Sequence, residues 1–237
     1  MKKILFVLIL CVLFIPGKLQ TLQLPQPDAP EIVELKCQEL YEEIGLEGIV
    51  NYKAFEQAIL GFHQVDRKNK DIIAVIDFSK PSTEERLYVI DLEEKELLFI
   101  SHVSHGKNSG DVLPTSFSNV NGSFQSSLGF FVTEGTYSGR GGYSLILDGL
   151  EKGINDKAKE RSIVMHGSRN ANPSVINKRG SLGRSLGCPA MPEAVTKPII
   201  NTLKGGAIVY ILQMMKSMWN KAPYLRMHPM LLNQSKK

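Results

Sequence analysis

The chain has 237 residues, of which 43% are hydrophobic and 22% are charged, which excludes a disordered chain and leaves room for one ordinary domain with additions or for two small ones. Its net charge of +4 is unevenly placed, because residues 214–237 hold five Lys or Arg and no Asp or Glu, so the remainder is close to neutral. A basic tail at 214–237 could contact an anionic polymer, a membrane surface or nucleic acid, and the simpler expectation is that it is solvated. We expect no nucleic-acid partner for the protein.

Residues 1–20 have the pattern of a secretory signal peptide. Two early lysines precede the apolar run 4–15, which is too short to span a membrane. No small-x-small cleavage site is evident, so an uncleaved anchor, with membrane association through the N-terminus, is the alternative. Cys11 follows a leucine where a lipoprotein signal would want a small residue, so we predict no lipid anchor. We expect an exported protein of the periplasm or cell envelope.

Residues 21–66 are predicted to form a linker followed by a helical pair. The linker, 21–30, is rich in Pro and Gln and has extended character. Apolar residues recur at helical spacing over 31–44, and glycines end this helix. Asn51 is the expected N-cap of a second helix that runs to Phe62. A segment of this size is too small to bury a core by itself, so we expect it to pack on the larger C-terminal part of the chain.

From residue 67 the pattern changes to short apolar runs with turn signals about every 8–12 residues, which predicts a β-sandwich or barrel over 67–213. The stretch 106–142 is dense in Gly, Ser, Asn and Thr and has no helical periodicity. One or two helical turns are expected at 156–161, and a helix at 192–203 in spite of Pro198. The predicted class is mainly β, with a short N-terminal helical segment and a few peripheral helices. The expected strands are 72–78, 86–91, 97–103, 130–132, 143–147, 162–165 and 207–212.

The stretch 185–190, SLGCPA, carries the strongest chemical signal. Cys188 follows a glycine and precedes a proline, which favours presentation of its side chain to a ligand over burial in a core. His166 ends the apolar run 162–165, and two loops at the ends of adjacent strands would bring its imidazole within reach of the thiol. An imidazole can hold a cysteine as the reactive thiolate, so we interpret Cys188 as a nucleophile and His166 as its base.

A disulfide is the structural alternative for Cys188. Removal of the signal would leave Cys37 and Cys188, and two cysteines in an exported chain can pair. Cys37, however, falls in a helical pattern among polar neighbours, whereas Cys188 lies in a loop with a histidine partner available. We therefore favour the nucleophile.

Glycines beside the two reactive residues are predicted to give backbone support. Gly187 has no Cβ, so the backbone can approach a substrate closely. The amides around Gly187 and Cys188 would hold the oxyanion of a tetrahedral intermediate, a type of contact commonly worth about 3 kcal/mol per donor. No Asp or Asn stands out as the group that orients His166, and we expect a backbone carbonyl near Gly167 or Ser168 in that role.

Four stretches of the chain occur in a characteristic order: HVSHG at 102–106, SFQSSLG at 123–129, VMHGS at 164–168 and GRSLGCPA at 183–190. The His-Gly step followed by Ser-x-Gly-Cys resembles the catalytic domain of the YkuD-type L,D-transpeptidases. The resemblance is closest to the divergent branch of murein L,D-transpeptidase catalytic domains, and it covers roughly 71–212. It implies a β-rich YkuD-like sandwich.

The resemblance also implies a reaction. Cys188 would attack the carbonyl of the third residue, a diamino acid, of a peptidoglycan tetrapeptide stem. The terminal D-alanine would leave, protonated by His166, and an amine of a second stem or water would resolve the thioester. The first outcome is L,D-transpeptidation and the second is L,D-carboxypeptidase activity, while a non-catalytic cell-wall-binding protein is the further alternative. No cofactor is implied, and the sequence determines neither the acceptor nor the oligomeric state.

The substrate-binding side departs from the commoner family pattern. That pattern often has an arginine two residues after the cysteine, where this chain has Ala190, and Arg184 or Arg179 is the candidate replacement. Ser185 and His105 are the other candidates for contact with substrate. The usual Thr-Pro-x-Gly stretch is also replaced, by Ser-Ser-Leu-Gly.

Three histidines, His102, His105 and His166, raise the alternative of a zinc site. The His-x-x-His spacing on a strand directs the first two side chains to different faces, and no Asp or Glu accompanies them at ligand spacing. We therefore predict no metal.

Overall fold

The computed structural model of the chain describes residues 30–139 and 141–214. The predicted signal peptide or anchor, the linker up to residue 29 and the basic tail from residue 215 lie outside the described residues. Among the helices of the described ranges, none is both long enough and apolar enough to cross a membrane.

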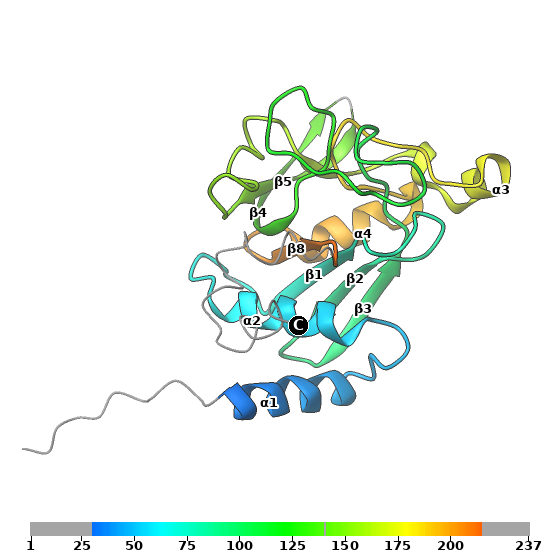
Figure 1. Ribbon diagram of the computed structural model, residues 1–237. Helices are drawn as coiled ribbons and strands as arrows, with labels where there is room; N and C mark the ends of the chain where they lie inside the picture. Colours follow the sequence, from blue (N-terminus) through cyan, green and yellow to red (C-terminus); the bar gives the residue numbers. More distant parts are fainter. Residues whose placement is uncertain (1–29, 140, 215–237) are drawn as a thin grey trace, which may run out of the picture.

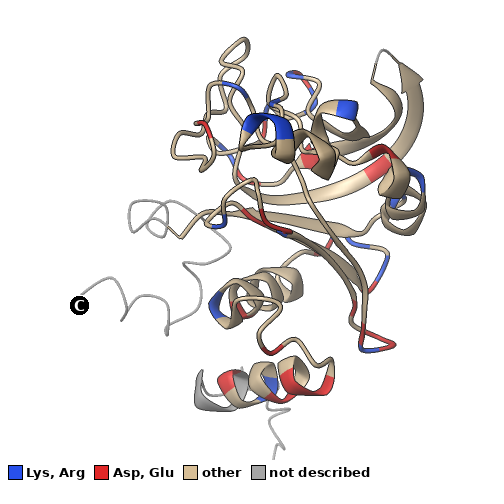
Figure 2. Cartoon of the chain, turned by 90° about the vertical axis from the view of Figure 1, so that its right-hand side faces the viewer, with Lys and Arg blue, Asp and Glu red and all other residues tan. Residues whose placement is uncertain are grey.

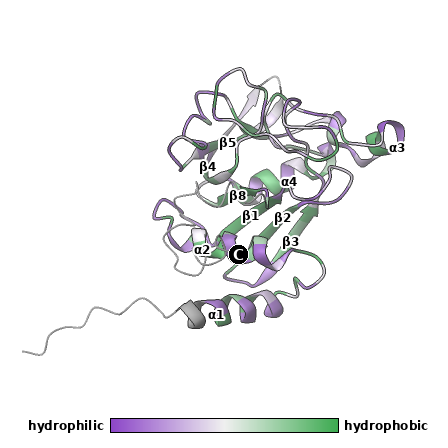
Figure 3. Ribbon diagram, viewed as in Figure 1, coloured by the Kyte–Doolittle hydropathy of each residue, from purple (hydrophilic) through white to green (hydrophobic). Residues whose placement is uncertain are grey.

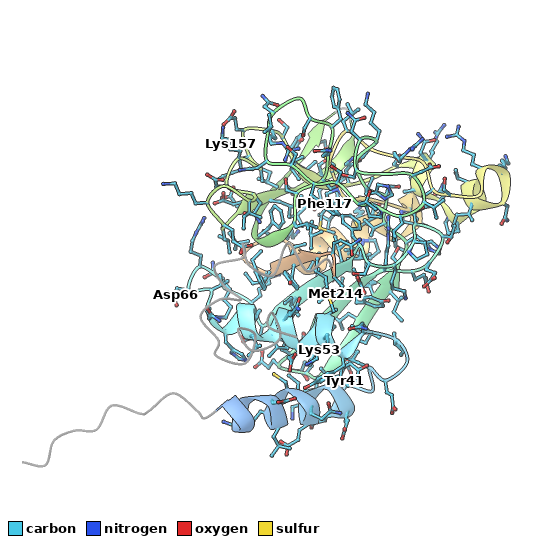
Figure 4. All side chains as sticks on the ribbon, viewed as in Figure 1. Tyr41, Lys53, Asp66, Phe117, Lys157 and Met214 are labelled. Atoms are coloured by element: carbon cyan, nitrogen blue, oxygen red, sulfur yellow. The ribbon has the colours of Figure 1, made fainter. Side chains whose placement is uncertain are left out.

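Two helices at the N-terminal side cover one face of the sheet. α1 spans Pro30–Glu43 and α2 spans Tyr52–His63, close to the predicted bounds. The Asn51 side chain caps α2 as expected, accepting a hydrogen bond of 3.2 Å from an N–H of the first turn. Tyr41, labelled on α1 in Figure 4, packs on Phe55 of α2, with ring centroids 5.5 Å apart. In Figure 1, α2 lies between α1 and the strands, so the helical pair shares its core with the sheet.

Eight strands form one hydrogen-bonded sheet in the order β3-β2-β1-β8-β4-β5-β6-β7. The β1–β8 and β6–β7 pairs are parallel, and the other neighbours are antiparallel. The predicted mainly-β class is therefore confirmed, with helices as minor elements. The strands are Ile72–Asp77 (β1), Leu87–Asp91 (β2), Glu96–Ser101 (β3), Gly129–Gly139 (β4), Gly142–Gly149 (β5), Val164–Gly167 (β6), Ala190–Met191 (β7) and Ile208–Leu212 (β8).

Both faces of the central strands are buried, which explains their nearly continuous apolar sequences. Along β1, Ile73 and Val75 face the core shared with α2, whereas Ala74 and Ile76 face a second core on the opposite side. α4, which spans Glu193–Leu203, packs on this second core. Figure 3 shows the strands as the most hydrophobic part of the chain, and Figure 2 shows the charged residues mainly on helices and loops.

The segment after β3 connects the two ends of the sheet. Ser104 pairs with Ala190 of β7 through N–H···O bonds of 2.8 and 3.4 Å, and Gly106 forms a bridge with Ser185. Since β3 is the first strand in the sheet order and β7 the last, the sheet must curve until the chain leaving one end reaches the other. This closure places the loop that precedes β7 against the residues after β3.

Three elements differ from the sequence prediction. Residues 151–162 form a series of turns without the helix expected at 156–161. The polar loop before β7 holds two short 3₁₀ helices and the four-residue helix α3, Ile176–Arg179. β7 was not predicted, because a strand of two residues is too short to show a periodicity. Elsewhere the predicted helices and strands are present, most of them with small shifts of their ends, but β4 runs to Gly139, well beyond the strand predicted at 130–132.

Candidate active site

An open pocket of about 440 Å³ lies over one end of β5, β6 and β7. Its walls come from these strands, from the turn between β4 and β5, and from the loop that precedes β7. Cys188 and His166 line this pocket, as do Ser185 and Arg184, whereas His105 is not among its lining residues. The structure thus brings together two stretches that the sequence separates by more than twenty residues.

The pairing of β6 with β7 places the chain segment of Cys188 beside that of His166. In the parallel β6–β7 ladder His166 lies opposite Ala190, and Cys188 comes two residues before Ala190. Its sulfur accordingly lies beside Val164, whose N–H donates to Sγ at 3.5 Å. Val164 and His166 share one face of β6, because side chains alternate along a strand, and same-face neighbours stand about 6.6 Å apart. The sulfur and the imidazole thus belong to paired chain segments, and both residues line the pocket.

The thiol of Cys188 is half-buried and forms two polar contacts within the protein. It accepts from Val164 N–H and donates to the carbonyl of Ser162, each at 3.5 Å. Among the described residues, none of the hydrogen bonds of Cys188 goes to His166. Burial raises the pKa of the Cys188 thiol, and the Val164 amide, the Arg161 guanidinium and the Cys188 amide oppose that rise.

The backbone holds His166 in one tautomer. Its Nδ1 lies 2.8 Å from the carbonyl oxygen of Gly167. A carbonyl only accepts, so Nδ1 carries the proton and Nε2 is the basic nitrogen. This is the kind of carbonyl contact that the sequence led us to expect. Gly141 covers the ring so closely that a Cβ there would stand 3.2 Å from Nδ1.

Gly167 supports the site through its packing as well as through its carbonyl. A Cβ at this position would stand 2.8 Å from Oγ1 of Thr196 on α4. The absence of a side chain lets β6 approach α4, and this approach fixes the strand that carries His166. The predicted backbone support from Gly167 is thus exerted on the imidazole.

Gly187 combines a positive φ with a close backbone neighbour. Its φ is +129°, and a Cβ there would stand 2.9 Å from the carbonyl oxygen of Gln125. Its N–H donates to Oγ of Ser185 at 3.1 Å, and the same hydroxyl donates to the carbonyl of Cys188 at 2.6 Å. Ser185 therefore shapes the loop that presents the thiol, and the Gly187 amide already has an acceptor.

Ser126 ties this loop to the segment after β3. Its hydroxyl is buried, accepts from the N–H of Gly106 at 3.0 Å and donates to the carbonyl of Gly187 at 3.0 Å. The sequence indicated the SSLG stretch only as a replacement in a family motif. The structure gives Ser126 a physical task, which is to join two of the motif stretches through one hydroxyl.

The two arginines proposed to replace the usual arginine have different positions. Arg184 lines the pocket, but its Nη1 forms an ion pair with Asp111 at 3.0 Å, and its side chain is 41% exposed. Arg179 is exposed at the end of α3 and is not among the pocket-lining residues. Neither presents an uncompensated charge to the pocket.

His105 is a buried structural residue in this fold. Its Nδ1 accepts from Nη2 of Arg86 at 2.9 Å, which leaves the proton on Nε2, 3.3 Å from the carbonyl of Gly110. Burial, followed by the charge of Arg86, lowers its pKa to about 4. Arg86 itself is fully buried and donates to the carbonyls of Lys80 and Val103. The interpretation of His105 as a substrate contact thus has no support in this geometry.

Neither a metal cluster nor a disulfide is found within the described ranges. No group of three or more His, Cys, Asp or Glu side chains there is arranged to hold a metal ion. His102 donates instead to the carbonyl of Thr83 at 3.3 Å. Cys37 and Cys188 are both free thiols, so the disulfide between them is not formed.

Sequence reasoning missed the segment that connects the turns at 151–162 to β6. Arg161 and Ser162 both line the pocket, and Ser162 has a φ of +55°, which is unusual for a residue with a side chain. This conformation aims the Ser162 carbonyl at the thiol. The available signal was a cation, Arg161, directly before the apolar run 162–165 that leads to His166.

Comparison with known proteins gives one family match. A family model described as the L,D-transpeptidase catalytic domain matches residues 46–212. A solved L,D-transpeptidase from Mycobacterium smegmatis is 12% identical, with a TM-score of 0.38, over 60% of this chain and 59% of that chain. One from Stackebrandtia nassauensis is 13% identical, with a TM-score of 0.37, over 74% and 75% of the two chains. No curated protein matches.

Proposed function

Because the chain belongs to the L,D-transpeptidase catalytic domain family, we propose that it is a cysteine acyltransferase that acts on the tetrapeptide stems of peptidoglycan. The observation that supports this proposal is the parallel pairing of β6 with β7, together with the open pocket that both Cys188 and His166 line. The proposed working region is the predicted domain 67–213 together with α2, which the family match includes.

In the first half of the reaction, the Cys188 thiolate attacks the carbonyl carbon between the third residue of the stem and the terminal D-alanine. His166 takes the thiol proton on Nε2 and returns it to the departing amine, so free D-alanine leaves and a thioester remains. The Gly167 carbonyl supports this role, because it holds the proton on Nδ1 and stabilises the imidazolium that forms.

The oxyanion of the tetrahedral intermediate needs a donor near the sulfur. The Gly187 N–H already donates to Ser185, so we assign the oxyanion contact to the N–H of Cys188, which lies beside its own sulfur. Gly187 then acts by allowing the backbone turn that exposes this amide. Ser185 and Ser126 hold the turn from its two sides.

In the second half, the side-chain amine of a diamino acid on another stem attacks the thioester and releases the thiol, which forms a cross-link. Water at the same position would instead release a tripeptide stem, which is the carboxypeptidase outcome. The two outcomes differ in their products, a cross-linked dimer in the first case and a tripeptide stem in the second.

The test is incubation of the protein with purified tetrapeptide muropeptides, with the products read by mass spectrometry. Wild type is expected to release D-alanine and form dimers, and Cys188→Ala is expected to form neither. Cys37→Ala is the matched control, because Cys37 belongs to α1, is buried in the core that α1 shares with α2, and is not among the pocket-lining residues, so this variant should retain turnover. Turnover by Cys188→Ala, or no product from wild type, would contradict the proposal, and tripeptide without dimers would assign water as the acceptor.

A second test needs no muropeptide. A carbapenem should acylate Cys188 and add its mass to the intact protein, and the adduct should be absent in Cys188→Ser. An adduct retained in that variant would move the nucleophile elsewhere. Export and attachment through residues 1–20 are part of the proposal, and fractionation of cells that produce the full chain tests them.

A further inference from the structure

Arg161 is the charged residue at the pocket whose charge no carboxylate of the described ranges compensates. It is half-buried, lies at the end of the turns at 151–162, and lines the pocket together with Cys188. The four hydrogen-bond acceptors that its Nη1 and Nη2 contact are all neutral. They are the carbonyls of Ser118 and Gln125 and the hydroxyls of Ser123 and Ser127.

Burial of a cation without a carboxylate partner costs free energy, so the half-buried position of Arg161 indicates that its charge has a function. Burial lowers the pKa of Arg161, and the ionisable group that acts in the opposite direction is Cys188. Arg184, the other arginine at the pocket, differs because it is exposed and paired with Asp111. The charge that remains available to an anion in the pocket is therefore that of Arg161.

The guanidinium is also rigidly placed beneath the nucleophile loop. Its Nη2 donates to the Gln125 carbonyl at 2.6 Å and lies 3.6 Å from the point where a Cβ of Gly187 would stand. Gln125 O is the same atom that a Gly187 side chain would meet at 2.9 Å. One fork therefore fixes the 118–127 segment and faces the residue that precedes the thiol.

We propose that Arg161 is the counter-ion of the Cys188 thiolate, held in place by four neutral acceptors of the 118–127 segment. It is a positioning residue, since it acts on the substrate through the sulfur. Formation of the thiolate transfers the thiol proton to His166 or to solvent, and Arg161 stabilises the negative charge that remains. This inference rests on the proposed nucleophile, and it names the charge that opposes the rise in the Cys188 pKa caused by burial.

The experiment measures the rate of alkylation of Cys188 by iodoacetamide between pH 6 and pH 10, with peptide mass spectrometry to separate Cys188 from the other cysteines. The midpoint of the profile is the apparent pKa of the thiol. In Arg161→Gln, we expect the midpoint to rise by about one pH unit and the rate at pH 7 to fall about tenfold. Arg161→Lys keeps the charge but not the fork, so its midpoint should lie between the two.

Lys157→Gln is the matched control. Lys157 lies one turn earlier on the same segment, is exposed at the periphery (Figure 4), and carries the same charge away from the pocket. Its substitution should leave the midpoint of Cys188 unchanged. An equal shift in Lys157→Gln would mean that net charge, and not Arg161 itself, sets the midpoint, and would overturn the proposal.

Two further outcomes decide the question. A midpoint in Arg161→Gln equal to that of wild type would overturn the proposal. If circular dichroism shows that this variant does not fold, the alkylation midpoint of wild-type Cys188 is measured at low and at high KCl. Salt screens the interaction between Arg161 and the thiolate, so high KCl should raise the midpoint. An unchanged midpoint would refute the pairing. The assay needs no turnover, so a shifted midpoint without muropeptide products would sink the proposed function alone, and products with an unshifted midpoint would sink this inference alone.

Discussion

The substitution Gly187→Ala tests whether a close backbone approach shapes the nucleophile loop. The added Cβ would stand 2.9 Å from the Gln125 carbonyl oxygen and 3.0 Å from Cδ1 of Ile163. The carbonyl cannot yield freely, because the Arg161 guanidinium holds it at 2.6 Å. In addition, φ at this position is +129°, which residues with a side chain rarely adopt.

A control glycine separates the cost of a side chain at positive φ from the cost of steric overlap. Gly180 has a φ of +73° at the end of α3, and a Cβ there would meet nothing within 4 Å. Gly180→Ala should therefore cost only the left-handed conformation, about 1 kcal/mol. Gly187→Ala adds a steric overlap in a packed site and should cost about 3 kcal/mol in total. For a protein of this size the second change corresponds to a fall in Tm of about 6–12 °C.

The assay is thermal unfolding by circular dichroism, combined with the alkylation rate of Cys188 at pH 7. Gly187→Ala should unfold at a clearly lower temperature than Gly180→Ala, and only Gly187→Ala should change the reactivity of the thiol. Equal losses of stability in the two variants, with Cys188 reactivity unchanged in both, would refute the argument that the Gln125 contact constrains the loop.

Three other predictions concern buried polar groups and the two described thiols. Burial holds the pKa of His105 at about 4 in the folded protein, whereas the unfolded chain takes up a proton at this residue below about pH 6.5. The free energy of unfolding should therefore fall by roughly 3 kcal/mol as the pH drops from 6.5 to 4. Urea titrations of His105→Gln should show a weaker dependence of the free energy of unfolding on pH. Ser126→Ala leaves the Gly187 carbonyl and one buried N–H without partners, and chemical unfolding should show a loss of about 2–3 kcal/mol; a loss below half of that would mean that water replaces the hydroxyl. Burial raises the pKa of Cys37 to about 11, so iodoacetamide should label Cys188 in the native protein and Cys37 only after denaturation.

Local sequence patterns were sufficient for the elements and for the residue types at the site. The spacing of apolar residues gave both N-terminal helices, the Asn51 cap and most strands, because helix and strand periodicities are properties of neighbouring residues. The order of His-Gly and Ser-x-Gly-Cys indicated the family, which the match over 46–212 bears out. The short strand β7 was missed because two residues show no periodicity, and the helical turns predicted at 156–161 were wrong because this segment forms a series of turns.

The sequence by itself determined a mainly-β enzyme domain and nominated a cysteine and a histidine. Only the tertiary structure decided what surrounds them, because those contacts depend on the order and curvature of the sheet. The β6–β7 ladder places Cys188 beside Val164, and the closure at Ser104 brings the 118–127 segment under the nucleophile loop. Arg161 reaches this segment from the turns at 151–162, where the sequence predicted helix. His105 carries a motif signal but is turned into the core by Arg86, since burial and not residue type determines whether an imidazole can meet a substrate.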